Sequence, residues 1–86
     1  MTGRGAGPVR GVPGPRRESL DQDHDVVIYP INKLRSNRYR CQVHVLRSNG
    51  EWTQSTFLGD GKNEYQAREA ALAKARQAIR AGKIMY

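Results

Sequence analysis

Hydrophobic and polar residues alternate most regularly over residues 38–46, and this period of two predicts a β-strand. Asn49 and Gly50 follow; both residue types tolerate the positive φ angles of a hairpin turn, so residues 51–58 are expected to return as another strand. An earlier run of β-branched residues, 25–31, predicts a first strand, with Pro30 marking an edge position or a bulge. The polar segment 32–37 between these strands is expected to be a loop.

The register of the hairpin decides the environment of Phe57. If Asn49 and Gly50 are the two loop residues, Val43 lies opposite Thr56, and Phe57 points to the other face of the sheet. A bulge would instead bring Phe57 under the helix. The sequence leaves both arrangements open.

The hydrophobic period changes to that of a helix after residues 59–62, whose two glycines predict a tight turn. Asn63 is a candidate N-cap and Gln66 can complete a capping box, so a helix is expected from Glu64 to about Ala81, ended by Gly82. One side of this helix carries small residues suited to close packing on a sheet: Ala67, Ala71, Ala75 and Ala78. The predicted fold class is α+β: a three-stranded antiparallel sheet (β-β-β-α) packed on one C-terminal helix.

Residues 1–20 are rich in glycine, proline and arginine and show neither hydrophobic period, so we expect a disordered arm before a single domain at 21–86. The arm is either a phosphate-contacting segment or an extension without a selected role.

Composition narrows the class of protein. Hydrophobic residues make up 37% of 86 residues, enough for a sheet covered by one helix but hardly for a deep substrate pocket as well, so no enzyme activity is expected. Cys41 is the single cysteine, which excludes an internal disulfide and a cysteine-based zinc site within one chain. No apolar run approaches the length of a membrane span, and no signal peptide is recognisable. We expect a cytoplasmic protein with no cofactor, no membrane contact and no small-molecule substrate.

The net charge of +7 and the pI near 10.2 favour polyanionic partners, nucleic acid first. The first twenty residues carry +3 of this charge and the remainder +4, which is also ordinary for a protein that binds no nucleic acid.

Three motifs that suggest catalysis or ligand binding have simpler explanations. Cys41 and His44 stand three apart on a strand and so point to opposite faces, which excludes a shared metal or proton. Asp23, His24 and Asp25 lie where the arm meets the first strand and form a solvated charge cluster. The glycines of residues 59–61 lack the spacing of a phosphate-binding loop.

The basic residues around the second strand form the predicted binding site. Arg38 and Arg40 share the sheet face opposite Tyr39, where polar side chains such as Thr53 and Ser55 are expected to accompany them. Such a face can contact phosphates or base edges, although any one-layer sheet also exposes a polar face to water. The complete predicted nucleic-acid-binding set is Lys33, Arg35, Arg38, Arg40, His44 and Arg47.

The order of strands and helix, with Glu64, Ala67, Ala70 and Ala71 packing the helix, resembles the ethylene-response-factor and integrase amino-terminal DNA-binding domains. That resemblance implies a sheet face laid in the major groove. In outline the chain is equally similar to small bacterial domains of unknown function built from a three-stranded sheet and an alanine-rich helix.

Residues 59–72 also resemble the end of a double-stranded-RNA-binding domain. The matching positions are Gly59, Gly61, Ala67, Arg68 and Ala71. Glu64 and Tyr65 occupy the positions of the phosphate-gripping lysines, however, and the first helix of that fold is missing.

Two functions are therefore expected. The first is a small nucleic-acid-binding or nucleic-acid-associated accessory protein, with DNA and RNA both open, that uses the basic outer sheet face. The alternative is a protein-interaction module, with a homodimer as one form, that uses the edge of the first strand or the terminal residues Ile84, Met85 and Tyr86.

Overall fold

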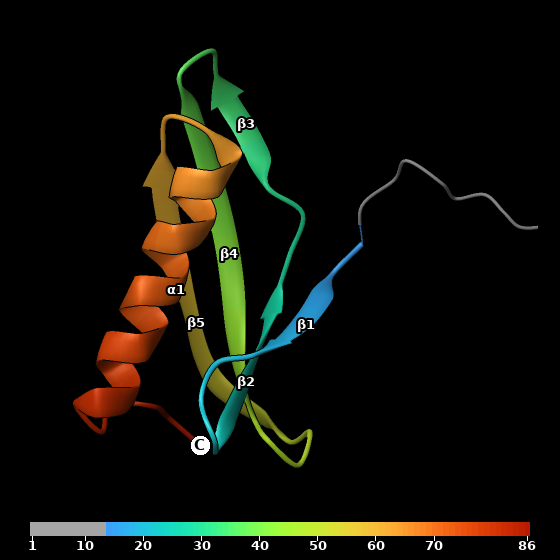
Figure 1. The fold of residues 1–86 in the computed structure, drawn as a ribbon, viewed down its shortest axis with the longest axis vertical. Helices are drawn as coiled ribbons and strands as arrows, with labels where there is room; N and C mark the ends of the chain where they lie inside the picture. Colours follow the sequence, from blue (N-terminus) through green and yellow to red (C-terminus); the bar gives the residue numbers. More distant parts are fainter. Residues whose placement is uncertain (1–13) are drawn as a thin grey trace, which may run out of the picture.

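The computed structural model describes residues 14–86, an α+β fold in which one helix covers one face of a five-stranded antiparallel sheet (Figure 1). The chain order is β1 (Arg16–Ser19), β2 (His24–Ile28), β3 (Asn32–Arg35), β4 (Arg38–Arg47), β5 (Trp52–Gly61) and α1 (Glu64–Arg80). The α+β class and the C-terminal helix agree with the prediction, but the sheet has five strands where the sequence predicted three.

The long strand β4 organises the sheet. β5 pairs along one edge of β4, while β2 and β3 pair one after the other along its opposite edge. Pro30 lies in the gap between β2 and β3, where the first predicted strand is interrupted. The segment expected to be a loop, 32–37, instead forms β3 and a tight turn into β4.

β1 is the second additional strand and lies in the segment assigned to the disordered arm. It pairs with β2 along the edge that β4 does not use, and Arg17 forms an ion pair with Asp25 at 2.8 Å. Most of β1 is exposed, so its sequence carries no hydrophobic alternation, and only backbone pairing with β2 defines it. Residues 1–13 of the predicted arm lie outside the described residues.

The turn between β4 and β5 has three loop residues, not two. The backbone N–H of Arg47 donates to the carbonyl of Glu51 at 2.8 Å, which encloses residues 48–50. Gly50 has φ of 97°, the left-handed conformation that a three-residue hairpin loop needs at its last position. The longer loop moves the register by one residue and turns every following side chain of β5 to the opposite face.

The observed register makes Phe57 a core residue. Phe57 lies opposite Val43 and packs against the buried cluster, whereas Leu58 lies opposite Gln42 and is exposed. The register built on a two-residue loop is therefore wrong. The alternative, in which a bulge brings Phe57 under the helix, is confirmed: Gly50, in the left-handed conformation at the end of the turn, is the extra residue that changes the face.

A second bulge lies within β5, where residues 53–55 stand opposite Val45 alone. β5 thus has two more residues than β4 at this point. Because the side-chain period of a strand is two, these two residues leave the alternation of faces along β5 unchanged. The hydroxyl of Thr53 donates to the Val45 carbonyl at 2.6 Å, and Nε2 of His44 donates to the Thr53 carbonyl at 2.5 Å. These side chains replace the ladder hydrogen bonds that the bulge interrupts.

Helix α1 begins where the sequence predicted. The side chain of Asn63 accepts the backbone N–H of Gln66 at 2.8 Å, and Gln66 accepts the N–H of Lys62 at 3.0 Å. Its first turn carries Glu64 and its last turn Arg80, which suits the helix dipole. With 17 residues, α1 is not long and apolar enough to cross a membrane, and no other helix occurs in residues 14–86.

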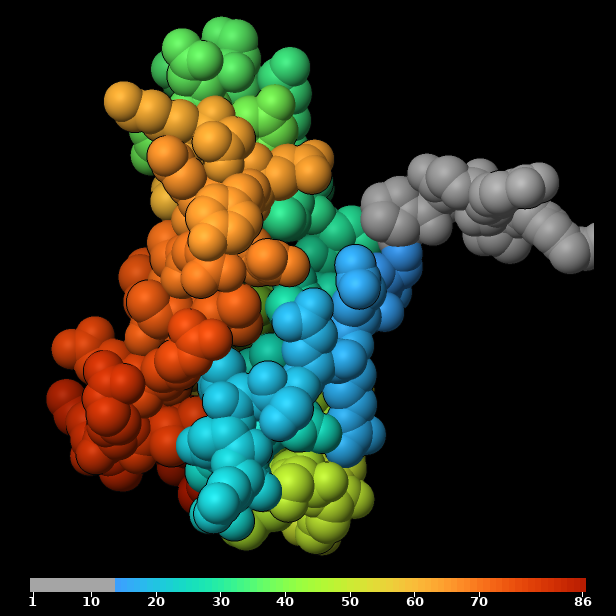
Figure 2. Space-filling view, viewed as in Figure 1, coloured from blue at the N-terminus to red at the C-terminus, as the bar shows by residue number. Residues whose placement is uncertain are grey.

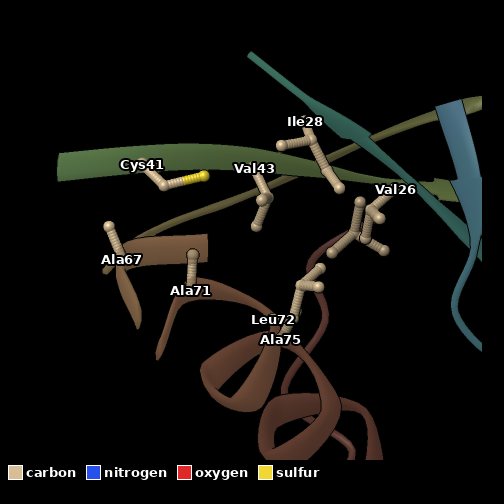
Figure 3. Packing of buried hydrophobic residues seen from close by; sticks show 9 residues of the cluster. Val26, Ile28, Cys41, Val43, Ala67, Ala71, Leu72 and Ala75 are labelled. Carbon is tan, nitrogen blue, oxygen red and sulfur yellow. The ribbon is translucent and has the colours of Figure 1, made fainter. Parts of the chain in front are cut away.

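The core lies between α1 and the middle of the sheet (Figure 3). Gly59 lies beneath the helix: a Cβ there would stand 2.5 Å from the carbonyl oxygen of Ala67 and 2.8 Å from the carbonyl carbon of Ala70. Both predicted turn glycines belong to β5, and their missing side chains let the small face of α1 approach the strand closely. The buried cluster contains Val26, Ile28, Cys41, Val43, Val45, Ala67, Ala71, Leu72 and Ala75.

Candidate functional site

Four of the six predicted site residues come together at one end of the sheet. Lys33 and Arg35 lie on β3, Arg38 and Arg40 lie at the start of β4, and the β3–β4 turn joins them. The register places Lys33 opposite Tyr39, on the helix-side face, and Arg35 opposite Arg38, on the outer face. Three of the four are exposed, and Arg40 is half-exposed. This hairpin projects past the beginning of α1, as the green residues in Figure 2 show. We call Lys33, Arg35, Arg38 and Arg40 the cation cluster.

Asp60 is the acid that orients two members of the cation cluster. One carboxylate oxygen accepts Nε of Arg40 at 2.8 Å; the other accepts one terminal nitrogen of Arg40 at 3.1 Å and one of Arg38 at 3.4 Å. The hydrogen bonds and charge of Arg40 lower the pKa of Asp60, and Asp60 in turn raises the pKa of Arg40. The carboxylate therefore stays ionised at neutral pH and holds two guanidinium groups side by side.

Lys62 extends the positive surface at the same end. β5 ends at Gly61, opposite Tyr39, so Lys62 follows next to the start of β4. Lys62 is not among the predicted site residues, because residues 59–62 were expected to form a tight turn. Lys62 and the cation cluster together carry five positive charges, against which Asp60 is the one acid shown in contact with them among residues 14–86.

His44 does not join the cation cluster. Its Nε2 bonds to the Thr53 carbonyl, and its ring meets the Trp52 ring edge-on with centroids 4.7 Å apart. Because the carbonyl oxygen can only accept, Nε2 carries the hydrogen. His44 therefore stabilises the bulge of β5.

Arg47 does not join it either. The register places Arg47 opposite His24, on the face that Tyr39 and Val43 share, so the predicted placement on the outer face is wrong. Its guanidinium lies 3.9 Å above the ring centre of Tyr86 and 3.5 Å from the Glu51 carboxylate. Arg47 thus holds Tyr86 against the sheet.

The outer sheet face is less polar than predicted. The reversed register of β5 buries Thr53 and Ser55, and Leu58 and Trp52 stand on the outer face in their place, 46% and 57% exposed. The outer face is strongly basic only at the end that carries Arg35, Arg38 and Arg40, so the candidate binding surface is smaller than the whole face.

Asp21, His24 and Tyr86 form the most organised polar group elsewhere. Nδ1 of His24 donates to the Asp21 carboxylate at 3.2 Å, and Nε2 lies 2.6 Å from the Tyr86 hydroxyl. Burial alone would raise the pKa of Asp21, but hydrogen bonds from the Asp23 backbone and from His24 lower it overall. This order of groups can activate a hydroxyl, yet none of the three lines either groove described below. We assign the group to docking of the terminal segment.

Two grooves lie on the helix side of the sheet. The larger, about 360 Å³, is bounded by β1, by the segment between β2 and β3, and by the first turns of α1. Its charged lining residues balance: Arg16 and Arg68 against Glu18 and Glu64. Nε of Arg68 is buried without a hydrogen-bond partner. The balanced charge gives this groove no preference for an anion.

The structure offers little support for metal or thiol chemistry. In the described range, 14–86, no group of three or more His, Cys, Asp or Glu side chains is placed to hold a metal ion. Cys41 is fully buried, and desolvation raises the pKa of its thiol, which disfavours the reactive thiolate.

No known protein family, no curated protein and no solved structure matches this chain.

Proposed function

We propose that the protein binds nucleic acid through the cation cluster and Lys62. The observation that carries the proposal is the gathering of five exposed or half-exposed cations, against one contacting acid, at a projecting end of the sheet. Lysine and arginine side chains that neutralise phosphates release condensed counterions, and this release supplies most of the affinity of non-specific binding.

The contacts expected at this surface are to phosphates. Asp60 holds Arg38 and Arg40 in place through only some of their N–H groups, so the remaining donors are free to bind phosphate oxygens. A guanidinium that is already oriented loses less conformational entropy when it binds. The exposed Leu34 between Lys33 and Arg35 adds an apolar contact at the hairpin.

Salt-dependent binding tests the proposal. We would measure affinity for duplex DNA, duplex RNA and single strands between roughly 50 and 200 mM salt, using the whole chain and residues 14–86. The predicted arm, residues 1–20, is not removed whole, because a chain that starts at Leu20 lacks β1. The double variant Arg38→Gln with Arg40→Gln is expected to reduce the slope of log affinity against log salt by roughly 1.8 on duplex DNA, about 0.9 per phosphate contact.

A matched control removes the same charge from another surface. Arg76→Gln with Arg80→Gln changes two exposed arginines of α1 and is expected to leave affinity and slope close to those of the parent chain. If both double variants lost affinity and salt slope equally, net charge alone would drive binding. Binding that disappears when residues 1–13 are removed would assign the activity to that segment and contradict the proposal.

The alternative function, a protein-interaction module, requires a different surface from the two first considered. β1 pairs along the edge of β2, which removes that edge as a docking site. The backbone of Met85 bonds to β5, and Tyr86 bonds to His24, so both residues already have partners within the chain.

A further inference from the structure

The edge of β5 that faces away from β4 carries unpaired backbone groups. The N–H of Tyr29 donates to the carbonyl of Gln42 on the β2 side of β4. Because backbone groups alternate along a strand, residues of β4 on either side of Gln42 point toward β5 instead. Their partners in β5 point back, so Thr56, Leu58 and Asp60 direct their backbone groups to the open edge.

Two contacts show how this edge is used within the chain. At one end the N–H of Gln54 donates to the carbonyl of Met85 at 2.6 Å, and the N–H of Met85 donates to Oγ of Ser55 at 2.8 Å. Further along, Nζ of Lys74 donates to the Leu58 carbonyl at 2.7 Å. The protein's own terminal segment therefore bonds to one end of the edge, and a lysine covers the carbonyl of Leu58.

Side chains on both faces of this edge offer apolar contacts. On the outer face Leu58 is 46% exposed, and Thr56 is exposed beside it. On the helix side a groove of about 290 Å³ adjoins the edge. Its lining consists of Phe57, Lys74, Gln77, Ala78, Ala81 and Lys83. Such an edge has what strand addition requires: free main-chain groups with side-chain contacts on alternate faces.

We propose that residues 56–60 bind an extended peptide segment of another protein as a sixth strand, with an apolar side chain in the groove beside Phe57 and carboxylates on either side of it. The groove favours a peptide with carboxylates, because its two charged lining residues are both lysines, Lys74 and Lys83. A backbone N–H of the incoming peptide replaces the ammonium group of Lys74 as the donor to the Leu58 carbonyl. The released Lys74 ammonium then pairs with a carboxylate of the peptide.

A second copy of this chain fits the edge less well. Antiparallel pairing of two β5 strands would bring the lysines of both grooves to the same interface, and each groove lacks a carboxylate among its lining residues. Like charges placed together at an interface oppose association. The surface meets the cation cluster only at Asp60, whose backbone belongs to the open edge and whose carboxylate contacts Arg38 and Arg40. Substitution of those two arginines therefore tests the nucleic-acid site without changing a residue of the edge.

The probe is an acetylated and amidated peptide, Thr-Glu-Val-Val-Val-Glu-Thr, added to the isotope-labelled whole chain. We expect the amide signals of Thr56, Leu58 and Asp60 to shift and to become protected from hydrogen exchange. Two further peptides, methylated on alternate backbone nitrogens, separate strand addition from other contacts. One must fail to bind and the other must bind, because only alternate N–H groups of an added strand face β5.

Two protein variants complete the test. Thr56→Pro removes an outward N–H, which an edge strand tolerates, and Lys74→Glu reverses one charge of the groove. Each is expected to weaken peptide binding about tenfold or more, whereas the control Arg76→Glu, with the same charge change elsewhere on α1, changes it less than about twofold. If Thr56→Pro does not fold, the Lys74→Glu result and the methylated peptides decide.

Three results would overturn the proposal. The first is that about 1 mM peptide leaves the amide signals of Thr56, Leu58 and Asp60 unshifted. The second is that the two methylated peptides bind with equal affinity. The third is that a peptide with lysines in place of both glutamates binds as tightly as the original peptide. The Arg38→Gln and Arg40→Gln double variant is expected to bind the peptide normally, which distinguishes this site from the nucleic-acid site.

Discussion

The hydroxyl of Tyr86 lies 2.6 Å from Nε2 of His24, although 62 positions separate the two residues. Asp21 accepts the opposite ring nitrogen, so in neutral His24 the unprotonated Nε2 accepts the Tyr86 hydroxyl. Arg47 lies over the Tyr86 ring, and Ile84 packs against the core. These contacts bind the segment after α1 to the first strand of the core.

We expect Tyr86→Phe to lower the free energy of unfolding by about 1–3 kcal/mol, because Nε2 of the buried His24 loses its partner. Phenylalanine keeps the ring beneath Arg47, so the variant tests the hydroxyl alone. Urea denaturation measures the change. Tyr65→Phe, on a residue that is 66% exposed, is the control and should stay within about 0.5 kcal/mol of the parent chain. Equal stability of Tyr86→Phe and the parent chain would contradict the contact.

Gly59→Ala should destabilise the protein by about 3 kcal/mol or more. The new Cβ would meet the backbone of α1 at Ala67, Ala70 and Ala71, and helix backbone cannot move aside as a flexible side chain can. Thermal unfolding followed by circular dichroism measures the effect. Gly14→Ala is the matched control, because no atom lies within 4 Å of a Cβ placed there. Similar behaviour of both variants would show that α1 does not approach β5 this closely.

Phe57 and Leu58 test the hairpin register. Phe57→Ala should lower the free energy of unfolding by about 2–3 kcal/mol, because it removes a ring packed against the core. Leu58→Ala should cost less than about 1 kcal/mol, because nearly half of that side chain is already exposed. Chemical denaturation of both variants gives the comparison. A larger loss of stability in Leu58→Ala than in Phe57→Ala would instead support the register with a two-residue loop.

The ion pair between Asp60 and Arg40 predicts a dependence of stability on acid pH. The pKa of Asp60 is lower in the folded chain than in the unfolded chain, where it is about 3.9. Its contribution to stability is therefore fully present above about pH 4–5 and is lost as the pH falls through the lowered folded value. Asp60→Asn, which cannot ionise, should show a weaker loss of thermal midpoint between about pH 5 and 2.

The same variant tests the cation cluster. Asp60→Asn removes the one contacting acid, so at pH 7 we expect tighter binding to duplex nucleic acid and a salt slope at least as steep as that of the parent chain. Weaker binding would mean that orientation of Arg38 and Arg40 by Asp60 contributes more than the charge it cancels.

Several features followed from the sequence because they depend on local chemistry. The cap at Asn63, the helix from Glu64 and the positive φ of Gly50 and Gly82 reflect the conformations those residues favour within one turn of backbone. The alternation in β4 likewise records which of its side chains face the core. Local preferences of this kind need no knowledge of distant residues.

The missed strands have a different origin. β1 is mostly exposed and β3 is fully exposed, so neither needs hydrophobic alternation, and each is defined by hydrogen bonds to a strand elsewhere in the chain. The register of β5 depended on one additional loop residue, which the pair Asn49 and Gly50 could not reveal.

The candidate sites divide in the same way. The sequence by itself placed Lys33, Arg35, Arg38 and Arg40 near one another, because all four lie within eight positions of the chain; the β3–β4 hairpin that joins them was not predicted. Only the tertiary structure decided that Asp60 orients two of them, that Arg47 turns to Tyr86, and that β5 keeps an open edge. Those relationships depend on strand order and register, which are set by the packing of the whole sheet against α1 rather than by local sequence.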